Sequence, residues 1–517
     1  MQAYGLTVDR FLDHAAKWHG RVPVITAGED AVDYSALRER ANRLSGALLD
    51  IGLRPGDRLA TLAWNTRHHV EVWYASMGVG IVCHTLNPRL TVAHLAAMII
   101  EAGDRVLVVG QGLGELARAL AAACPCIERL ILLDGDRPLD GVLPEDDLET
   151  FLASRGRAAV WGEIDENAGA GLCFTSGTTG APKGVLYTHR ANYLQTLRSA
   201  QADALALKGT DVVLVAVPMF HANAWGLPFS APAVGATLVL PGRVTDGAAL
   251  ARLINDHGVT VAVGVPTVWL GLVDHLDATG VETPSLKRIV VGGSSIPAAL
   301  IARLEARLGC TVQTSWGMTE LSPMGTLSPP SDTPGAAEAS GHVPMGMDMQ
   351  LFDADGAALA QQRNVVGHLK VRGHSVVDRY WGQTQSSLDA DGWFDTGDLA
   401  IIDDDGALTI AGRSKDLIKS GGEWINPVEM EDIVGALPSV GLVAVIGRSD
   451  PKWGERPLMV IEPRQGHVVE DAAVVASLKG RVADWWIPDR IVTVPTMPLA
   501  ATGKINKLHL RATYGDA

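Results

Sequence analysis

The chain has 517 residues, of which 47% are hydrophobic and 20% are charged, and its formal net charge is −15 at pH 7. This length exceeds what one hydrophobic core supports, so at least two domains are expected, and the hydrophobic content excludes global disorder. The acidic balance and the lack of a basic run argue against nucleic acid and anionic membranes as partners.

The sequence carries no pattern of a secreted or membrane protein. Residues 1–6 lack a basic segment followed by an apolar one, and the apolar runs at 72–83 and 212–220 are too short for a membrane span. Neither metal-site nor disulfide spacing connects the five cysteines. We therefore expect a cytoplasmic protein without stable membrane insertion. The cysteines are Cys83, Cys124, Cys126, Cys173 and Cys310.

The first third of the chain reads as alternating strands and helices. Residues 58–64, 106–109 and 127–133 are apolar runs typical of buried strands, and residues 70–79 repeat apolar side chains at helical spacing. This pattern predicts an α/β layer that packs against a second, similar layer.

The stretch from about residue 165 to 320 repeats this organisation. Helical patterns between short β-branched runs are typical of βαβ units in a mostly parallel, doubly wound sheet, where ligands bind at the carboxyl ends of the strands. The predicted strands are residues 170–174, 212–217, 236–240, 259–265, 288–291 and 311–314, and the predicted helices are residues 190–204, 247–255, 268–276 and 297–308.

After Leu321 the pattern changes to short strands bounded by glycine, which predicts a small β-rich subdomain. Residues 353–356 (DADG) and 403–406 (DDDG) are typical of hairpin turns. A boundary near Gly412 then divides the α/β protein into a large N-terminal domain, residues 1–412, and a small α+β domain, residues 413–517. The strands expected in the subdomain are residues 343–349, 367–372, 400–402 and 407–411.

Residues 175–184 (TSGTTGAPKG) are the most informative stretch. Glycines let backbone N–H groups turn toward an anion, and hydroxyls and an ammonium add further donors. The spacing is not that of a Walker A loop, because Lys183 stands between a proline and a glycine. The stretch predicts a polyphosphate site made by Thr175, Ser176, Gly177, Thr178, Thr179, Gly180 and Lys183.

Residues 315–320 (SWGMTE) follow a predicted strand, as a ligand-binding loop should. Trp316 is suited to stacking on a purine and Thr319 to contacting a phosphate. Glu320 offers the hard oxygen ligand that Mg²⁺ prefers.

Two further turns suit a nucleotide. Residues 292–297 (GGSSIP) form a strand-to-helix glycine turn that can lie against a flat base. Asp398 closes residues 391–398 (DGWFDTGD), where its carboxylate is suited to bind both hydroxyls of a ribose.

Residues 412–429 (GRSKDLIKSGGEWINPVE) and 501–506 (ATGKIN) complete the set. In this order, the motifs resemble those of the adenylate-forming superfamily, which includes acyl-CoA synthetases, luciferases and the adenylation domains of peptide synthetases. Residues 218–226 (PMFHANAWG) and 419–425 (KSGGEWI) are most similar to fatty acyl-CoA ligases and methylmercaptopropionate-CoA ligases.

The resemblance implies a two-step reaction. A carboxylate attacks the α-phosphate of Mg-ATP to give an acyl-adenylate and pyrophosphate, and after the small domain rotates, coenzyme A thiol displaces AMP. By motif match Lys504 is the catalytic lysine of the first step and Lys415 lies at the hinge. The other implied residues are 175–180 and Lys183 for the phosphates, Thr319 for the α-phosphate, Glu320 and Thr179 for Mg²⁺, Gly293, Ser294, Ser295, Trp316 and Gly317 for the nucleotide, Asp398 and Arg413 for the ribose, and Gly421 and Gly422 for the pantetheine tunnel.

The chemistry independently requires a positioned cation. Attack on the α-phosphate brings two anions together, and a cation in a water-poor site offsets roughly 3 to 4 kcal/mol of that barrier. The same lysine would later obstruct the thiol, so a mobile domain that carries Lys504 on one face and Gly422 on another resolves the conflict.

The segments that line the acyl pocket in this superfamily are mostly apolar here, with His221 as the one polar group. Burial contributes about 0.8 kcal/mol per methylene, which favours a medium-chain fatty acid or an aryl-alkanoic acid over acetate. The predicted pocket residues are Phe220, Ala222, Trp225, Trp269, Met318 and Met324.

Other readings of the motifs remain. Enzymes that activate amino or hydroxy acids share this chemistry, but amino-acid activation normally needs a carboxylate where this sequence has His221. A luciferase-type oxygenase has no positive support. A non-catalytic nucleotide- or acyl-binding relative is disfavoured, because Lys183, Glu320, Asp398, Arg413 and Lys504 are all present. The expected partner is a small-molecule carboxylic acid, and the resemblance leaves a homodimer open.

Overall fold

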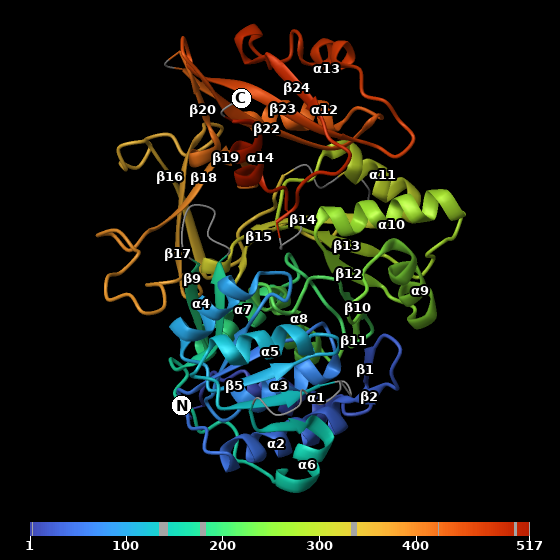
Figure 1. Cartoon of the computed structure of the whole chain (residues 1–517), viewed down its shortest axis with the longest axis vertical. Helices are drawn as coiled ribbons and strands as arrows, with labels where there is room; N and C mark the ends of the chain where they lie inside the picture. Colours follow the sequence, from blue (N-terminus) through green and yellow to red (C-terminus); the bar gives the residue numbers. More distant parts are fainter. Residues whose placement is uncertain are drawn as a thin grey trace.

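The computed structural model describes residues 1–2, 4–133, 143–175, 182–331, 335, 339–421, 423–500 and 504–515. Its strands form four sheets, of which two are large and mostly parallel. Figure 1 shows the C-terminal elements, in orange and red, above the large N-terminal part.

The first large sheet has seven strands in the order β7-β6-β5-β3-β4-β8-β9. All neighbours are parallel except β8 and β9, which form an antiparallel hairpin. Its strands are β3 (Arg58–Leu62), β4 (Val82–Thr85), β5 (Val106–Val109), β6 (Arg129–Leu132), β7 (Glu145–Asp147), β8 (Gly169–Thr175) and β9 (Lys183–Thr188).

The second large sheet has eight strands in the order β15-β14-β13-β12-β10-β11-β1-β2, antiparallel only at its two edges. The predicted strand at 170–174 is confirmed as a strand, but it belongs to the first sheet, where it pairs with β4. The strands are β1 (Pro23–Thr26), β2 (Val32–Asp33), β10 (Val212–Val215), β11 (Thr237–Leu240), β12 (Val261–Gly264), β13 (Arg288–Val291), β14 (Thr311–Gly317) and β15 (Met324–Leu327).

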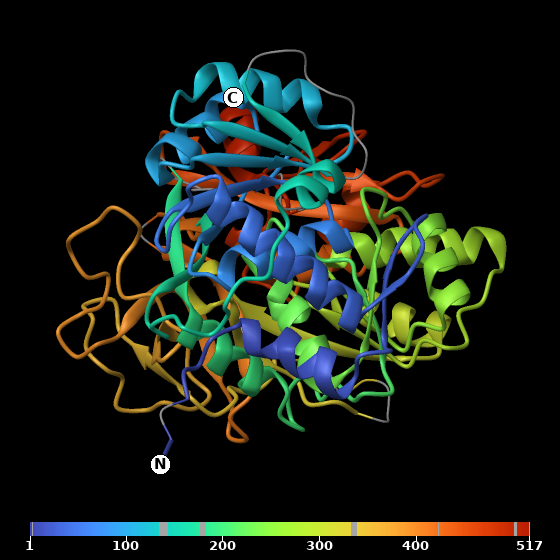
Figure 2. The same ribbon diagram turned by 90° about the horizontal axis from the view of Figure 1, so that it is seen from below.

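Helices cover both faces of each large sheet. One buried core lies between the two sheets and takes side chains from α1, α3 and α8, while α9, α10 and α11 cover the far side of one sheet and α4 and α5 that of the other. Figures 1 and 2 show this layering from two directions. The helices are α1 (Asp9–Trp18), α2 (Tyr34–Asp50), α3 (Arg67–Met77), α4 (Val92–Ala102), α5 (Gly114–Ala123), α6 (Leu148–Arg155), α7 (His189–Ser199), α8 (Leu227–Val234), α9 (Gly247–His257), α10 (Pro266–Thr279) and α11 (Ala298–Leu308), with 3-10 turns η1 (Ala222–Gly226) and η2 (Thr319–Leu321).

Side-chain caps explain where several helices begin. The Asp33 carboxylate accepts the Ala36 N–H at the start of α2, and Asp246 does the same for Ala249 at the start of α9. Such caps satisfy N–H groups that have no partner within the helix.

The β-rich subdomain is an antiparallel four-stranded sheet, as predicted. The expected turns at 353–356 and 403–406 are confirmed, because Asp353 N donates to Ala357 O and Asp403 N to Ala407 O. The first strand of this subdomain begins at Met347 rather than at residue 343, the start predicted from the sequence. The strands are β16 (Met347–Phe352), β17 (Gly367–Gly373), β18 (Phe394–Ile402) and β19 (Leu408–Arg413).

The C-terminal region builds its own sheet and two cores of its own. The subdomain sheet ends at Arg413 and the next strand begins at Ile418, while the domain boundary near Gly412 stays a prediction. The elements are η3 (Ser414–Asp416), β20 (Ile418–Ser420), β21 (Glu423–Ile425), α12 (Pro427–Gly435), β22 (Val440–Asp450), β23 (Gly454–Pro463), α13 (Asp471–Leu478), η4 (Asp484–Trp486), β24 (Arg490–Thr493) and α14 (Lys507–Tyr514).

Within the described ranges, no helix combines the length and apolar character that crossing a membrane requires.

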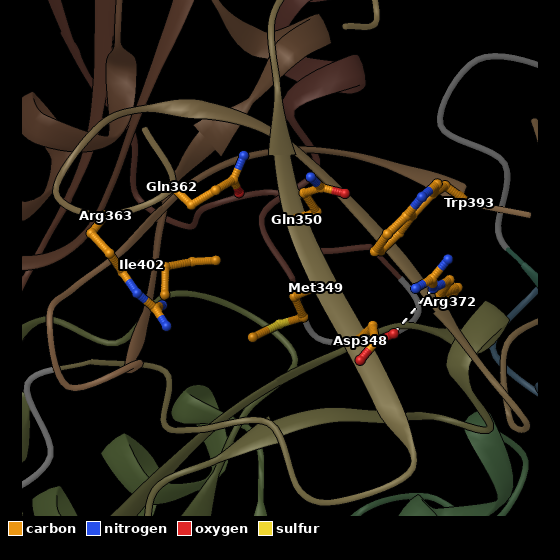
Figure 3. A pocket seen from close by; sticks show the side chains of 8 residues that line it. All are labelled: Asp348, Met349, Gln350, Gln362, Arg363, Arg372, Trp393 and Ile402. Atoms are coloured by element: carbon orange, nitrogen blue, oxygen red, sulfur yellow. Dashed lines mark hydrogen bonds and ion pairs between the residues drawn. The ribbon is translucent and has the colours of Figure 1, made fainter. Parts of the chain in front are cut away.

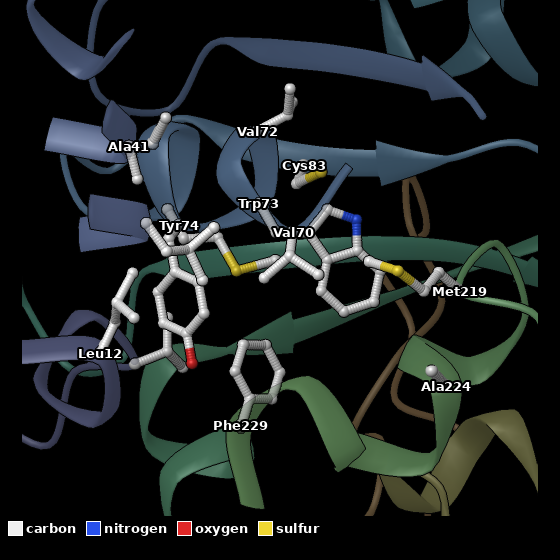
Figure 4. Close-up of a cluster of buried hydrophobic side chains, with 14 of the residues drawn as sticks. Leu12, Ala41, Val70, Val72, Trp73, Tyr74, Cys83, Met219, Ala224 and Phe229 are labelled. Atoms are coloured by element: carbon white, nitrogen blue, oxygen red, sulfur yellow. The ribbon is translucent and has the colours of Figure 1, made fainter. Parts of the chain in front are cut away.

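Aromatic and aliphatic side chains together fill the core between the two large sheets (Figure 4). The Phe229 ring centroid lies 5.9 Å from those of both Trp73 and Tyr74, and Phe229 is 1% exposed. We expect Phe229→Ala to cost about 3 to 5 kcal/mol of stability through the lost contacts and the cavity left behind, and Phe229→Leu to cost less. Differential scanning calorimetry measures the unfolding midpoint of each variant, which should fall most for Phe229→Ala. Trp18→Ala, at a 66% exposed side chain, is the control and should change the midpoint little.

Candidate functional site

The predicted phosphate loop joins β8 to β9. Thr175, the last residue of β8, and Lys183, the first residue of β9, are cross-strand partners. The Lys183 amine lies 4.7 Å from the centroid of the Tyr380 ring. The candidates Ser176, Gly177, Thr178, Thr179 and Gly180 lie outside the described residues.

Thr319 and Glu320 occupy the η2 turn directly after β14, and both are 8% exposed. The Tyr187 hydroxyl donates to the Thr319 carbonyl at 2.8 Å, and the Tyr380 hydroxyl donates to Glu320 Oε1 at 3.0 Å. Burial and the Glu320 charge raise the pKa of Tyr380, so this hydroxyl stays a donor. Two phenols therefore fix the backbone and the carboxylate of the turn.

Sequence reasoning missed Tyr380, which lies in an irregular stretch between β17 and β18. That stretch is held against the β8–β9 hairpin, because Trp381 N donates to Gly184 O at 2.7 Å. Residues 374–383 and part of β9 line a groove of about 340 Å³. The sequence feature that could have identified Tyr380 is the aromatic pair Tyr380–Trp381 within a polar stretch.

Asp398 and Arg413 are cross-strand neighbours on β18 and β19. Arg413 Nε lies 3.0 Å from Asp398 Oδ1, and the Trp316 indole N–H donates to Asp398 Oδ2 at 2.8 Å. Burial raises the pKa of Asp398, and both partners oppose that rise. Asp398 lies within a strand rather than in the expected tight turn.

Trp316 is 8% exposed and packs against Gly325, where an added Cβ would lie 2.4 Å from the indole. Its hydrogen bond makes it a positioning residue for the Asp398 carboxylate. Next to it, a Cβ on Gly317 would lie 2.2 Å from Pro323 O, so the backbone approach requires glycine there.

Lys504 approaches the large domain from the C-terminal region, and its carbonyl accepts a hydrogen bond from Ala500 N at 2.6 Å. A Cβ on Gly293 would lie 3.9 Å from Lys504 Cε, so the side chain passes the 292–297 turn. Burial, reinforced by the Arg413 charge, lowers the pKa of Lys504 to about 8, while the Asp398 and Glu320 carboxylates oppose the shift. The amine thus lies among the predicted nucleotide residues.

Helix α12 of the small domain contacts the same turn. The Asp432 carboxylate interacts with the Ser295 hydroxyl, and a Cβ on Gly435 would lie 3.5 Å from Pro297 Cγ. Burial and the neighbouring acidic groups raise the pKa of Asp432 to about 6. The turn that holds Gly293, Ser294 and Ser295 is therefore shared by both domains.

The predicted pocket residues around η1 have unusual backbone conformations. Ala222, Asn223, Ala224 and Trp225 all have positive φ, between 44° and 54°. Each such residue costs roughly 1 to 2 kcal/mol, so surrounding contacts must enforce the turn, as at many ligand sites. The Trp225 ring lies against Gly293, at 3.5 Å from the position of an added Cβ.

His221 precedes this turn. Burial lowers the pKa of its imidazole to about 4, and the Lys504 charge acts in the same direction. The ring is therefore neutral at physiological pH, and it lies close enough to Lys504 to feel its charge.

The remaining pocket candidates divide into two groups. Phe220 and Ala222 are buried near η1, and Met318 and Met324 flank η2 and its cis Ser322–Pro323 peptide. Trp269 is 0% exposed and belongs to the core under α9, α10 and α11, which sets it apart from this group.

The hinge and coenzyme A candidates lie in the small domain. Lys415 is in η3, and burial together with Arg413 lowers its pKa. Gly421 packs against the Trp453 ring, because a Cβ added to Gly421 would lie 2.9 Å from the nearest ring atom. Gly422 is outside the described residues.

A separate pocket of about 340 Å³ opens on the four-stranded sheet (Figure 3). Arg372 lies 3.1 Å from Asp348 and stacks on Trp393 there. None of the predicted site residues within the described ranges lines this pocket.

Comparison with known proteins identifies the family. Residues 11–381 match the model of AMP-binding enzymes, and residues 429–504 match the AMP-binding enzyme C-terminal domain. The chain belongs to the AMP-binding enzyme family. This confirms the superfamily resemblance inferred from the motifs.

Curated relatives match over nearly the whole chain. A 3-methylmercaptopropionyl-CoA ligase of Ruegeria lacuscaerulensis is 40% identical, with 100% of this chain and 99% of that protein covered. A medium-chain-fatty-acid–CoA ligase of Ectopseudomonas oleovorans is also 40% identical, with 99% and 96% covered. Among solved structures, ATP-bound MatB from Rhodopseudomonas palustris is similar, with a TM-score of 0.87, 27% identity and 99% of both chains covered.

The contact between Tyr380 and Glu320 predicts a measurable effect. Tyr380→Phe removes the donor to Glu320 Oε1, which should lower pyrophosphate-forming activity or apparent Mg²⁺ affinity about 10- to 100-fold. Titration of Mg²⁺ at saturating ATP measures this. Tyr4→Phe, at a 62% exposed ring, is the control, and equal behaviour of the two variants would contradict the assigned role.

The pKa of Lys504 predicts how ATP binding depends on pH. The amine is charged below about pH 8 in the nucleotide-free protein and loses its proton above that value. ATP phosphates favour the charged form, so the Kd should rise as pH increases above 8, by up to about tenfold per unit. Isothermal titration calorimetry measures the profile. Lys504→Gln should flatten it, and an unchanged profile in that variant would refute the assignment.

Proposed function

We propose that this protein is an ATP-dependent carboxylic acid:CoA ligase that forms an acyl-adenylate and then an acyl-CoA thioester. The observation that carries the proposal is the position of Lys504, which comes from the small domain and passes Gly293 toward Asp398 and Glu320. A buried cation among residues of this kind is what attack on a phosphate by a carboxylate requires.

In the first step the substrate carboxylate oxygen bonds to the α-phosphorus of ATP, and the bond to the β-phosphate bridging oxygen breaks to release pyrophosphate. Lys504 offsets the repulsion between the two anions, and Asp398 with Arg413 holds the ribose. Lys183 and Thr175 flank the loop that we assign to the phosphates. Partial burial strengthens each of these charge interactions.

Glu320 suits a Mg²⁺ ion that is held mainly by phosphate oxygens. Tyr380 donates to Glu320 Oε1 and so orients this carboxylate. The described residues contain no cluster of three or more possible metal ligands, which fits an ion that arrives with the nucleotide. Bound Mg²⁺ would neutralise phosphate charge. Thr179, a second proposed ligand, lies outside the described residues.

In the second step the coenzyme A sulfur bonds to the acyl carbon, AMP leaves and the thiol proton is lost. We propose that the small domain rotates about Lys415, which withdraws Lys504 and brings Gly421 and Gly422 to the pantetheine path. Asp432 and Ser295 would then separate.

We propose a medium-chain fatty or aryl-alkanoic acid as the substrate class, in a pocket bounded by Phe220, Ala222, Trp225 and Met324. Relatives named for medium-chain fatty acids and for methylmercaptopropionate support this range. Five unpaired cysteines support a cytoplasmic location. A homodimer through the large domain is testable by light scattering.

A panel of acids tests the function directly. Pyrophosphate release with ATP and Mg²⁺, and thioester formation when coenzyme A is added, should both occur with medium-chain or aryl-alkanoic acids. Adenylation that ignores coenzyme A would favour an enzyme that loads another acceptor. Nucleotide binding without pyrophosphate release for any acid would favour a non-catalytic relative.

Lys504→Ala should separate the two half-reactions. Pyrophosphate formation should fall about 10²- to 10³-fold, because the charge that offsets anion repulsion is gone. Conversion of a supplied acyl-adenylate with coenzyme A should persist. Lys208→Ala, at an exposed lysine, is the control. An equal loss in both half-reactions would refute this division of roles.

A further inference from the structure

Helix α7 buries an unusual row of polar side chains. His189, Asn192, Gln195 and Arg198 recur every three residues, and each is at most 2% exposed. Such residues are rarely buried unless their polar atoms are paired.

Most of the nitrogen atoms in this row lack an acceptor. The Arg198 Nη2 group donates to Gln195 Oε1 and to the Met324 carbonyl. In the described part of the chain, Arg198 Nε and Nη1, Gln195 Nε2 and Asn192 Nδ2 find no hydrogen-bond partner. Leaving a buried donor unpaired costs about 1 to 3 kcal/mol, and more for a charged group.

The charge of Arg198 is also uncompensated. Burial lowers its pKa to about 10, and no carboxylate among the described residues contributes to the shift. Burial, and after it the Arg198 charge, lowers the pKa of His374, so this neighbour does not offset the guanidinium charge. A buried guanidinium normally has an anionic partner.

Two members of the row, Asn192 and Arg198, contact residues at the proposed acyl pocket. Met324, whose carbonyl Arg198 contacts, is one of the pocket candidates. The Asn223 amide, in the left-handed turn between Ala222 and Trp225, lies 3.5 Å from Asn192 Oδ1. Figure 1 shows α7 beside α8, and α7 also packs on η1.

We propose that the acyl pocket ends at Arg198 and Gln195, and that the preferred substrate carries a hydrogen-bond acceptor, best a second carboxylate, at the end of its chain. This inference rests on the proposed ligase function and adds a polar group at the far end of the substrate chain. A distal carboxylate would pair the guanidinium and accept from its free N–H groups, which are suited to that geometry. The apolar walls at Phe220 and Trp225 would hold the methylenes between the two ends.

The first test uses the unaltered protein and needs no variant. Pyrophosphate release is compared for straight-chain monocarboxylic acids, α,ω-dicarboxylic acids and dicarboxylic acid monomethyl esters over a series of chain lengths. At the best length, the diacid should exceed the plain acid in kcat/KM by about 10- to 100-fold, with the ester between them because it keeps an acceptor without the charge.

Arg198→Met should abolish that preference, and Arg198→Lys should retain part of it because the charge remains. The matched control is Arg190→Met, since Arg190 lies on the same helix but is exposed and paired with Glu166 at 2.6 Å. The control variant should keep the full ratio of kcat/KM for the diacid to kcat/KM for the plain acid. Thermal stabilisation by the diacid, measured without ATP, should likewise disappear in Arg198→Met alone.

Two results would overturn the inference while leaving the ligase function intact. One is a wild-type protein that uses plain acids as well as diacids at every length. The other is an Arg198→Met variant that lowers activity on both classes by the same factor, which is the behaviour of a purely structural arginine. If no acid releases pyrophosphate, the proposed function itself fails.

Discussion

The site depends on one electrostatic arrangement, the delivery of a partly buried ammonium to a group of fixed charges. The Asp398 and Glu320 carboxylates raise the pKa of Lys504, whereas burial and the Arg413 and Lys415 charges lower it. With only the cations nearby, burying the charged amine would be unfavourable. With only the carboxylates nearby, the amine would form a static ion pair. The balance leaves the amine with a pKa of about 8 and free to respond to an incoming polyanion.

Neutral donors hold the fixed charges in place. Trp316 positions Asp398, Tyr380 positions Glu320, and Tyr187 holds the backbone of the same turn. Neutral groups orient a carboxylate without cancelling its charge, so the carboxylates keep their capacity for a ribose or a metal ion. Because these donors come from different layers of the fold, the site is set only when the layers pack together.

The two sides of the proposed acyl pocket follow different physical rules. Around η1, a strained left-handed turn is enforced by apolar packing of Ala222 and Ala224. On α7, a guanidinium and amides are buried without full compensation. Natural proteins retain backbone strain and unpaired buried polar groups where ligand binding offsets their unfavourable free energy. These features therefore indicate substrate specificity rather than a contribution to stability.

The sequence by itself determined the family, the order of the motifs and most strands and helices, because periodic patterns and glycine turns act through neighbours a few residues apart. It also predicted which charged residues take part in the reaction, and those roles stay predictions. Only the tertiary structure assigned β8 to the first sheet, placed Trp269 in a helix-covered core and showed that Trp316 donates to Asp398. These contacts join residues far apart in the chain, 82 positions for Trp316 and Asp398 and 126 for Arg198 and Met324. Local patterns carry no information about such pairs, since packing between layers decides them.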